Sequence, residues 1–542
     1  ASQTFTANGT IYARLWDGRN YGGTATGNVT NIDKTKPVVT GATATTNSIA
    51  ITATDEASGS GIVGYAVTTS NVAPTSFTSC TNTKTLSTTV SGKTQGTTYY
   101  VWVKDEAGNV SASKSTATGA VPNNITFSYT PTGWTNGNVT ATASTTATGY
   151  TLQTSKDGKS WTSTASQTFT TNGTIYARLW DGRNYGGTAT GNVTNIDTTK
   201  PTNVSLSAGT VSNKKITLTA SGADAQSGIA NYKFYINGTL VSTQTSATYQ
   251  YSSTFGDYNG YVIITDKAGN TKQSSTITFQ DYTISTKAEL EKFRDSANAG
   301  KNYYGKTVTQ VANIDLQSSY WTPINYFNGT YDGQHYRISN LYFSRDDARG
   351  GAMAWGLFKE IGLSGTVMSV KIYNITVDVR TSTSNNVVVG GVAAYNYGLI
   401  WCCGIYSGGL STFILTNGSA WLGAYSGGIV GQNYGEIKGC RNSATVHAYN
   451  DWSCSAEYHA AFAGGIAGVN DGLIENSYNL GEIYARSYNA TFAGGISGLR
   501  GNPIKYCYNA GKVTGFYTNG TMSVDEKGFR NYHKIRRSRR SI

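Results

Sequence analysis

Aspartates stand at matching places in two stretches of the chain, and they are the residues best suited to bind a metal ion. The six are Asp33, Asp55, Asp105, Asp197, Asp224 and Asp266. In each stretch the first aspartate lies shortly before a Lys-Pro pair, and the third opens an Asp-x-Ala-Gly-Asn motif. We expect the three of each stretch, with Glu56 in the first, to converge near a module end. Carboxylate oxygens are the ligands that Ca²⁺ prefers, although capping of turns is the simpler use of aspartate.

Large aromatic side chains near the C-terminal end form a second group of candidates. They are Trp401, Trp421, Tyr449 and Trp452. Flat rings on an exposed surface can stack on sugar rings or contact another protein. The alternative is that each ring packs against the fold instead. Calcium is the one cofactor that the sequence suggests.

The sequence offers little for catalysis. A zinc peptidase needs His-Glu-x-x-His, and the histidines, which are His335, His447, His459 and His533, are not spaced to form it. Asp315 and Asp332 are the nearest candidates for two carboxylates that cleave a sugar linkage. Asp332 precedes Gly333, however, in what reads as a structural turn. We therefore expect no catalytic residue and no enzymatic activity.

The letters Gly59-Ser60-Gly61-Ile62-Val63-Gly64 match the dinucleotide-binding fingerprint. That fingerprint requires a helix directly after the glycines, whose N-terminus meets the pyrophosphate. The residues that follow, Tyr65-Ala66-Val67-Thr68-Thr69, are typical of a strand. The segment is therefore predicted to be a glycine-rich turn.

Composition indicates an all-β protein with many turns. The 542 residues include 64 Gly, only 7 Pro and 12% aromatic residues, which is too apolar for a disordered chain. The net charge of +12 is unevenly spread, because residues 525–542 alone carry 7 basic and 2 acidic side chains. The remainder lacks the concentrated basic face that nucleic-acid binding requires.

Cysteines are few and lie mostly in the second half of the chain. The six are Cys80, Cys402, Cys403, Cys440, Cys454 and Cys507. Their spacing matches neither a disulfide framework nor a metal site. Cys403, Cys440 and Cys507 share a repeat position with Ser477, so we expect small buried side chains there.

Residues 390–509 contain one pattern four times. Its Gly-Gly pairs begin at Gly390, Gly427, Gly464 and Gly494. Aligned on these pairs, the third position reads Val392, Ile429, Ile466, Ile496, and the position eight residues later reads Ile400, Ile437, Ile474, Ile504. β-branched columns at a fixed period predict a β-solenoid with coils about 4.8 Å apart. Asn396, Asn433 and Asn470, each two residues before a glycine, read as turns with positive φ, and the Tyr-Asn pairs after the cysteine column predict stacked ladders.

These columns resemble the GLUG repeat of bacterial surface adhesins and of some immunoglobulin-A-cleaving metallopeptidases. The segment before them resembles the usual lead-in to such repeats, with Trp321-Thr322-Pro323-Ile324 and Asn328-Gly329-Thr330-Tyr331-Asp332-Gly333. The resemblance covers about residues 284–520 and departs in the last unit, where Asn502-Pro503 replaces the turn residues. It implies a parallel β-helix with a surface role.

The first half of the chain alternates two kinds of module. Residues 1–37 recur at 165–201 with two differences. Short alternating strands separated by Gly and Asn turns indicate β-sandwiches. The Asp-x-Ala-Gly-Asn turns at 105–109 and 266–270 resemble those of the immunoglobulin-like modules of Gram-positive surface proteins.

The expected organisation has six parts. They are a partial immunoglobulin-like module at 1–33, modules at 34–119, 120–197 (the second type) and 198–281, the solenoid at 282–524, and a basic tail at 525–542 that we expect to be disordered. One helix is predicted at 287–299, where Thr286 caps it, Glu289 completes a capping box, and Leu290, Phe293 and Ala297 share a face. This helix would cover the first coil of the solenoid.

Taken together, the sequence favours a fragment of a secreted bacterial cell-surface adhesin. A stalk of sandwich modules would present a solenoid that binds a protein or glycan of a host or neighbouring cell. We expect a monomer without a nucleic-acid partner, and association of the tail with the cell wall is one further use. The alternatives are the non-catalytic region of a surface peptidase, a β-helix polysaccharide hydrolase or lyase, and a purely mechanical spacer.

Overall fold

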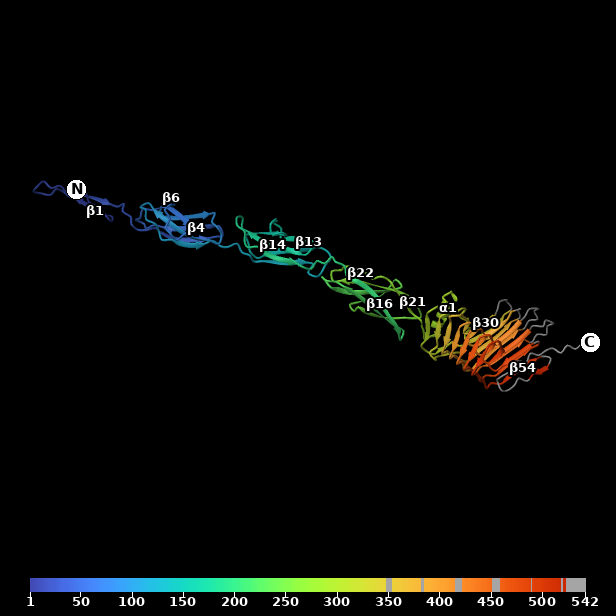
Figure 1. Cartoon of the computed structure of the whole chain (residues 1–542). Coiled ribbons are helices and arrows are strands. Elements are labelled where there is room, and N and C mark those ends of the chain that lie inside the picture. The colour runs from blue at the N-terminus through green and yellow to red at the C-terminus, as the bar shows by residue number, and fades with distance from the viewer. Residues whose placement is uncertain are drawn as a thin grey trace, which may run out of the picture. The chain divides into compact units, whose positions relative to one another are not determined.

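The chain is an all-β protein with one helix, as the composition predicts (Figure 1). The computed structural model describes residues 1–347, 353–381, 385–414, 422–450, 459–488, 490–517 and 520–522. Two compact units are recognised. The first comprises Ala1–Asn203, Gly222–Asn231 and Ile264–Lys272, and the second comprises Val204–Ser221, Tyr232–Ile263 and Gln273–Ile542. The tail at 525–542 lies outside the described residues.

The N-terminal strands β1 (Gly9–Ala13) and β2 (Ala25–Val29) form an antiparallel hairpin. The first sandwich follows. One of its sheets contains β3 (Val38–Ala44), β4 (Ser48–Thr54) and β7 (Thr85–Ser91), and the other contains β5 (Ile62–Thr68), β6 (Thr78–Thr83), β8 (Thr98–Asp105) and β9 (Lys114–Ala117). Alternate residues of β4 are buried, namely Ile49, Ile51 and Ala53, as a strand with one buried face requires.

The second sandwich is smaller. Its sheets are β10 (Ile125–Thr130), β11 (Val139–Thr145) and β13 (Ser166–Phe169), facing β12 (Thr151–Ser155), β14 (Gly173–Trp180) and β15 (Ala189–Val193). Val139 and Ile175 are fully buried in its core. The two sandwiches therefore share an architecture and differ in size, since the second has six strands and the first has seven.

A further pair of sheets spans residues 202–281. One contains β16 (Thr202–Ser212), β17 (Lys215–Ala223) and β20 (Thr248–Ser252), and the other contains β18 (Ile229–Ile236), β19 (Thr239–Gln244), β21 (Gly256–Asp266), β22 (Thr271–Gln273) and β23 (Ile277–Asp281). As in the first sandwich, the Asp-x-Ala-Gly-Asn motif begins at the last residue of a long strand, Asp105 of β8 or Asp266 of β21. The motif is therefore placed at one end of its module.

The C-terminal region is a parallel β-solenoid, drawn yellow to red in Figure 1. Five sheets, here called A to E in the order of the chain, run along it. Sheet A contains β24 (Thr283–Ile284), β25 (Thr307–Gln310), β27 (Thr330–Asp332), β32 (Thr366–Met368), β37 (Leu399–Trp401), β42 (Glu436–Lys438), β47 (Leu473–Glu475) and β52 (Ile504–Lys505). Sheet B contains β26 (Ile314–Asp315), β28 (Arg337–Ser339), β33 (Lys371–Tyr373), β38 (Gly404–Ile405), β43 (Arg441–Asn442), β48 (Tyr478–Asn479) and β53 (Tyr508–Asn509).

The longest strands are in sheet C. It contains β29 (Tyr342–Asp347), β34 (Ile375–Thr381), β39 (Gly408–Ile414), β44 (Thr445–Asn450), β49 (Ile483–Ser487), β54 (Val513–Tyr517) and β55 (Gly520–Met522). Sheet D contains β30 (Met353–Trp355), β35 (Val387–Gly390), β40 (Leu422–Gly427), β45 (His459–Gly464) and β50 (Ala490–Gly494), and sheet E contains β31 (Phe358–Ile361), β36 (Ala393–Asn396), β41 (Val430–Asn433), β46 (Ala467–Asn470) and β51 (Ser497–Arg500). Among the strands that the structure describes in the solenoid, β55 alone pairs antiparallel, with β54.

The aliphatic columns predicted from the repeats are confirmed. Ile400, Ile437, Ile474 and Ile504 pair in register on successive coils of sheet A. The Val392 amide donates to the Ile429 carbonyl at 2.9 Å, and the Ile429 amide donates to the Ile466 carbonyl at 3.0 Å. All three of these side chains are fully buried. Each coil thus buries its apolar side chains against the same residues of its neighbours.

The turn glycines have another role than predicted. Gly398, Gly435 and Gly472 are not among the residues with positive φ, so the prediction of left-handed turns there was wrong. A Cβ on Gly435 would lie 2.2 Å from the Gly398 carbonyl oxygen, and one on Gly472 would lie 2.0 Å from that of Gly435. Glycine is required because adjacent coils approach too closely for any side chain.

Buried asparagines form two hydrogen-bonded ladders. The Asn396 amide nitrogen donates to Asn433 Oδ1, and that of Asn433 to Asn470 Oδ1, both at 2.7 Å. A second ladder joins Asn442, Asn479 and Asn509, and the rings of Tyr478 and Tyr508 stack beside it at 5.0 Å. The predicted Tyr-Asn ladders are therefore confirmed. A buried amide must find partners, and here the next coil supplies them.

The cysteine column is buried, as predicted. The thiols of Cys403, Cys440 and Cys507 point to backbone carbonyl oxygens of the preceding coil at 3.5 to 3.9 Å. Ser477 takes the fourth place and donates to the Glu475 carbonyl. Burial raises the pKa of the Cys403 and Cys507 thiols. The column packs small side chains and presents no reactive thiolate.

The predicted helix is present as α1 (Lys287–Asn298), with Thr286 as its N-cap and Leu290, Phe293 and Ala297 buried. In a capping box, Glu289 would accept from the backbone N–H of the N-cap residue, Thr286. Its Oε2 instead accepts from the backbone N–H and the hydroxyl of the preceding residue, Ser285. The other oxygen, Oε1, pairs with Lys214 Nζ at 2.7 Å. Lys214 Nζ also lies 3.4 Å from the fully buried carboxylate of Asp281.

An aromatic cluster connects α1 with neighbouring strands of the same unit. Phe255 lies 5.5 Å from Tyr282, 5.7 Å from Phe293 and 6.3 Å from Tyr303 between ring centroids. Phe255 is 1% exposed and belongs to the core that continues through the solenoid. The β20–β21 turn is therefore fixed to the helix by apolar packing of Phe255, and the β16–β17 turn by the ion pair of Lys214 with Glu289.

Candidate functional site

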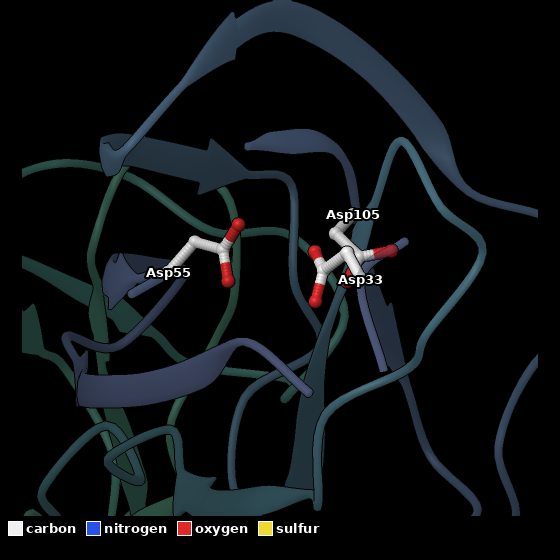
Figure 2. Close-up of side chains that lie close together, drawn as sticks. All are labelled: Asp33, Asp55 and Asp105. Atoms are coloured by element: carbon white, nitrogen blue, oxygen red, sulfur yellow. The ribbon is translucent and has the colours of Figure 1, made fainter. Parts of the chain in front are cut away.

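The structure brings Asp33, Asp55 and Asp105 together. One carboxylate oxygen of each lies within 4.8 Å of those of the other two. Figure 2 shows Asp33 beside Asp105, with Asp55 facing them. Asp105 and Asp55 are buried, and Asp33 is half-buried. These residues come from the entering linker, the end of β4 and the end of β8, which are far apart in the sequence.

Backbone N–H groups hold each carboxylate of this first cluster in place. Ser60 donates to Asp33 Oδ2 through both its N–H, at 2.7 Å, and its hydroxyl, at 2.8 Å. The Gly61 N–H donates to Asp55 Oδ2 at 2.7 Å. Asn109 donates to Asp105 through its N–H and to the Asp33 carbonyl oxygen through its side chain. The glycine-rich segment 59–64 thus serves the aspartates, and β5 follows it, as predicted.

The second cluster, Asp197, Asp224 and Asp266, repeats this arrangement with oxygens again within 4.8 Å of one another. The contacts correspond one by one: Ser227 N–H to Asp197 Oδ2 at 3.1 Å, Gly228 N–H to Asp224 Oδ1 at 2.7 Å, Asn270 N–H to Asp266 Oδ1 at 2.8 Å, and the Asn270 side chain to the Asp197 carbonyl oxygen at 2.9 Å. The segment from the middle aspartate to the donating glycine is two residues shorter here, Asp224 to Gly228 against Asp55 to Gly61. The carboxylates nevertheless converge.

Both clusters concentrate negative charge. Among the described residues, Lys84 Nζ, 4.0 Å from Asp55, is the one cation within ion-pair distance of the first cluster, and the second has none. Like charges at this separation repel by on the order of 1 to 4 kcal/mol per pair. Burial raises the pKa of Asp33, but hydrogen bonds from Ser60 and Thr35 lower it more, so the net pKa lies below its ordinary value. The same holds for Asp197 with Ser227 and Thr199.

The donor set fits a hard divalent cation. Three carboxylates offer only oxygen ligands. Glu56, which was expected to join the first cluster, is not part of this group, although its Oε2 is buried and has no hydrogen-bond partner. A bound Ca²⁺ would offset two of the three negative charges and join the linker to two turns of the module. The aspartates that the sequence singled out are therefore the ones that the fold collects. Ser60, Ser227, Asn109 and Asn270, which position them, were not singled out, although the Asn of each Asp-x-Ala-Gly-Asn motif was a visible signal.

The aromatic candidates of the solenoid do not form one site. Trp401 ends β37 on sheet A and is 51% exposed, whereas Tyr449 lies in β44 on sheet C. The Phe413 ring covers one face of Tyr449 at 4.4 Å and 3° between ring planes. That face of Tyr449 is therefore occupied within the fold, and ligand binding by Tyr449 stays a prediction. Trp421 and Trp452 lie outside the described residues.

A ladder of side chains on sheet B escaped the sequence analysis. It consists of Arg337, Tyr373, Tyr406, Arg441, Tyr478 and Tyr508, one from each successive coil. The Tyr373 and Tyr406 rings stack at 4.6 Å, and the Arg441 guanidinium lies 4.1 Å from the Tyr406 centroid. The columns of Tyr and Arg beside the buried isoleucines and asparagines were the available signal. We call this set the sheet-B ladder.

The carboxylates considered for sugar cleavage belong to turns. Asp315 accepts from the Gln317 N–H and the Asn340 side chain, which lowers its pKa, and Asp332 accepts from the Gln334 N–H. Among the described residues, neither Asp315 nor Asp332 belongs to a cluster of carboxylates that could bind a metal ion. Turn formation is the function that these contacts support.

Comparison with known proteins supports the module assignment. Residues 195–285 match the family model described as "Bacterial Ig domain". Halomucin of Haloquadratum walsbyi is 26% identical over 34% of this chain, and the match covers 2% of Halomucin. The chain therefore spans a very small part of that relative. Tandem immunoglobulin-like modules are present, and the second cluster of aspartates lies inside the matched range.

Solved structures resemble parts of the chain at low identity. A protein described as a putative immunoglobulin A1 protease from Bacteroides ovatus is 18% identical, covering 46% of this chain and 80% of that one with a TM-score of 0.32. The fibronectin(III)-like modules of CbhA from Clostridium thermocellum are 20% identical, with 28% and 90% covered and a TM-score of 0.18. Domains A168–A170 of titin are 16% identical, with 44% and 94% covered and a TM-score of 0.22. No function passes to this chain from these names.

In the described part of the chain, no helix combines the length and the apolar character needed to cross a membrane.

Proposed function

We propose that this chain is part of a bacterial cell-surface adhesin outside the cell, in which immunoglobulin-like sandwiches form a stalk and the GLUG-like solenoid binds a protein or glycan of another cell. The observation that supports binding is the sheet-B ladder, which presents an arginine or a tyrosine at each of six successive coils. Such a row can contact an extended partner at many points, whereas a catalytic centre needs a unique polar cluster. The alternatives of a peptidase or polysaccharide-cleaving enzyme gain no support from the described carboxylates.

The binding role is tested with the purified full chain and a control that ends after residue 197, within which the first two sandwiches are complete. Both are labelled and applied to arrays of glycans and of surface proteins. We expect the full chain to bind a subset of glycans or proteins that the control leaves unbound. Equal signals from both proteins, or none from either, would refute a binding role for the solenoid.

We propose that the two aspartate clusters bind Ca²⁺ and stiffen the stalk where one module enters the next. The repetition of the same contacts around loops of different length supports this role. Calcium at about 100 times its dissociation constant would stabilise each of the two sandwiches that hold a cluster by about 2.7 kcal/mol. Calorimetry of the full chain should then show sandwich transitions that rise in Ca²⁺ and fall in chelator, with the solenoid transition unmoved.

The control for calcium is the double variant Asp105→Asn, Asp266→Asn, which removes one charged ligand from each cluster. We expect this variant to lose most of the Ca²⁺-dependent shift. Terbium luminescence offers a second readout, because it reports occupancy without requiring a change in stability. If neither Ca²⁺ nor chelator shifted the sandwich transition temperatures, and terbium luminescence did not increase, the role of these aspartates would be turn capping.

A further inference from the structure

The sheet-B ladder differs from the other rows of the solenoid in its charge. Its two arginines and the neighbouring Lys371, on the same outward side of sheet B, have no carboxylate within ion-pair distance among the described residues. Two cations of the adjacent sheets are paired instead. Lys438 of sheet A meets Glu436 at 2.6 Å, and Arg380 of sheet C meets Asp378 at 3.0 Å. Sheet B therefore carries a stripe of unpaired positive charge.

Arg441 is held in a position that suits an anion. Its guanidinium lies between Tyr406 at 4.1 Å and Tyr478 at 5.7 Å, and one of its terminal nitrogens donates to the Ser443 hydroxyl. Its Nε is buried and has no hydrogen-bond partner. Gly404 makes room for it, because a Cβ there would lie 2.7 Å from Arg441 Cγ. A guanidinium held between two rings keeps its remaining N–H groups available for an oxyanion.

The tyrosines present their edges rather than their faces. Tyr373 stacks on Tyr406 with 10° between ring planes, and Tyr478 stacks on Tyr508 with 3°. Because each ring covers one face of the other in its pair, ring edges and phenol hydroxyls are the groups that both rings of a pair offer to a partner, at about the coil spacing of 4.8 Å within the pair. Such a row offers hydrogen bonds to a linear molecule that lies along the solenoid axis.

We propose that the sheet-B ladder binds a linear acidic polysaccharide laid along the solenoid axis, with its carboxylate or sulfate groups on Arg337, Lys371 and Arg441; this inference rests on the adhesin function proposed above. A polymer of pyranose residues repeats at about the length of one coil, so successive sugars meet successive side chains. An acidic peptide is less suited. Peptides that bind sheets add to a free strand edge, and every strand of sheet B between β28 and β48 is already paired on both sides.

The test measures binding of the full chain to polygalacturonate and chondroitin sulfate by biolayer interferometry, with neutral dextran and polyglutamate alongside. We expect at least one acidic polysaccharide to bind, more weakly at higher salt, and dextran not to bind. Arg441→Gln should weaken binding about tenfold, the loss expected when a hydrogen bond between charged groups is removed. Arg380→Gln is the matched control. Arg380 also lies over an aromatic ring, but it is already paired with a carboxylate, so its loss should change the affinity by less than about twofold.

Lys371→Gln is the second variant, because Lys371 stacks on no ring and its loss leaves the ladder intact. We expect it to weaken binding about threefold to fivefold without changing the melting temperature. Failure of both acidic polysaccharides to bind, or equal binding of polyglutamate, would overturn the proposed ligand class. If Arg441→Gln and Lys371→Gln both bound like the wild type, the ladder would not be the site, while the array experiment would still decide the adhesin function separately.

Discussion

The sandwiches and the solenoid assemble their candidate sites in opposite ways. Each aspartate cluster draws three side chains from turns tens of residues apart, so one substitution removes a third of its ligands. The sheet-B ladder draws one side chain from each coil, in two neighbouring columns of the sheet, because Tyr373 and Tyr406 stand two residues after the position that Arg337, Arg441, Tyr478 and Tyr508 share. One substitution therefore leaves the neighbouring coils in place. The comparison teaches that the sandwich site depends on tertiary folding of one module, whereas the solenoid site depends on register between coils.

The largest expected effect is on register. Gly435→Ala would place a Cβ 2.2 Å from the Gly398 carbonyl oxygen and 2.6 Å from the Tyr397 carbonyl carbon, which are backbone atoms that cannot rotate away. We expect the solenoid to lose about 3 kcal/mol or more of unfolding free energy, measured by urea denaturation. Gly133→Ala, in open space in a sandwich, should cost less than about 0.5 kcal/mol. Equal losses would show that coil contact is not the constraint.

The next effect concerns the ion pairs beside α1. Lys214→Met leaves the buried Asp281 and the mostly buried Glu289 without their cation, and we expect a loss of about 2 to 3 kcal/mol. Burial raises the pKa of Glu289, but hydrogen bonds from Lys214 and Ser285 lower it further, below its ordinary value. A lowered folded pKa gives stability that is complete above the unfolded pKa and is lost as pH falls through the folded pKa. Melting should therefore drop on acidification below about pH 4.5, and less steeply in Lys214→Met. A parallel pH profile in the variant would contradict the assignment.

An intermediate effect is expected within the asparagine ladder. Asn433→Ala removes the shortest acceptor of the Asn396 amide and leaves the buried Asn470 Oδ1 without its Asn433 donor, and we expect a cost of about 2 kcal/mol in the solenoid transition. Asn28→Ala, at an exposed position of the N-terminal hairpin, serves as the control for losing an amide. A cost for Asn433→Ala no greater than that of the control would mean that the amides add little to the stacking of the coils.

The smallest effect belongs to the cysteine column. Cys440→Ser copies the residue that already stands at 477, whose hydroxyl donates to a carbonyl of its own coil. We expect a change below about 1 kcal/mol, and no change in polysaccharide binding, because the column faces inward. A large loss would indicate that this thiol has a role beyond filling space.

The sequence predicts best what repetition or a fixed period reveals. The all-β class, the isoleucine columns, the helix after Thr286 and the two sets of aspartates follow from spacing alone. The glycines of the coil turns were misread, because glycine serves both positive φ and close contact, and only the distance between coils distinguishes them. The sheet-B ladder was missed because Arg441 takes a tyrosine's place in it, so no single residue type repeats.

Asn109 and Asn270 have a consequence for how such a chain changes in length. The side chain of each donates to the backbone carbonyl oxygen of Asp33 or Asp197, which belong to the segment found twice, at 1–37 and 165–201. The acceptor of this contact therefore lies in the repeated segment, and the donor lies in the module that follows it. Recombination between the two copies of this segment would insert or delete whole modules. Each linker aspartate would still be followed by a module whose asparagine binds its carbonyl oxygen. Length can vary between generations while the contacts at these two junctions are inherited intact.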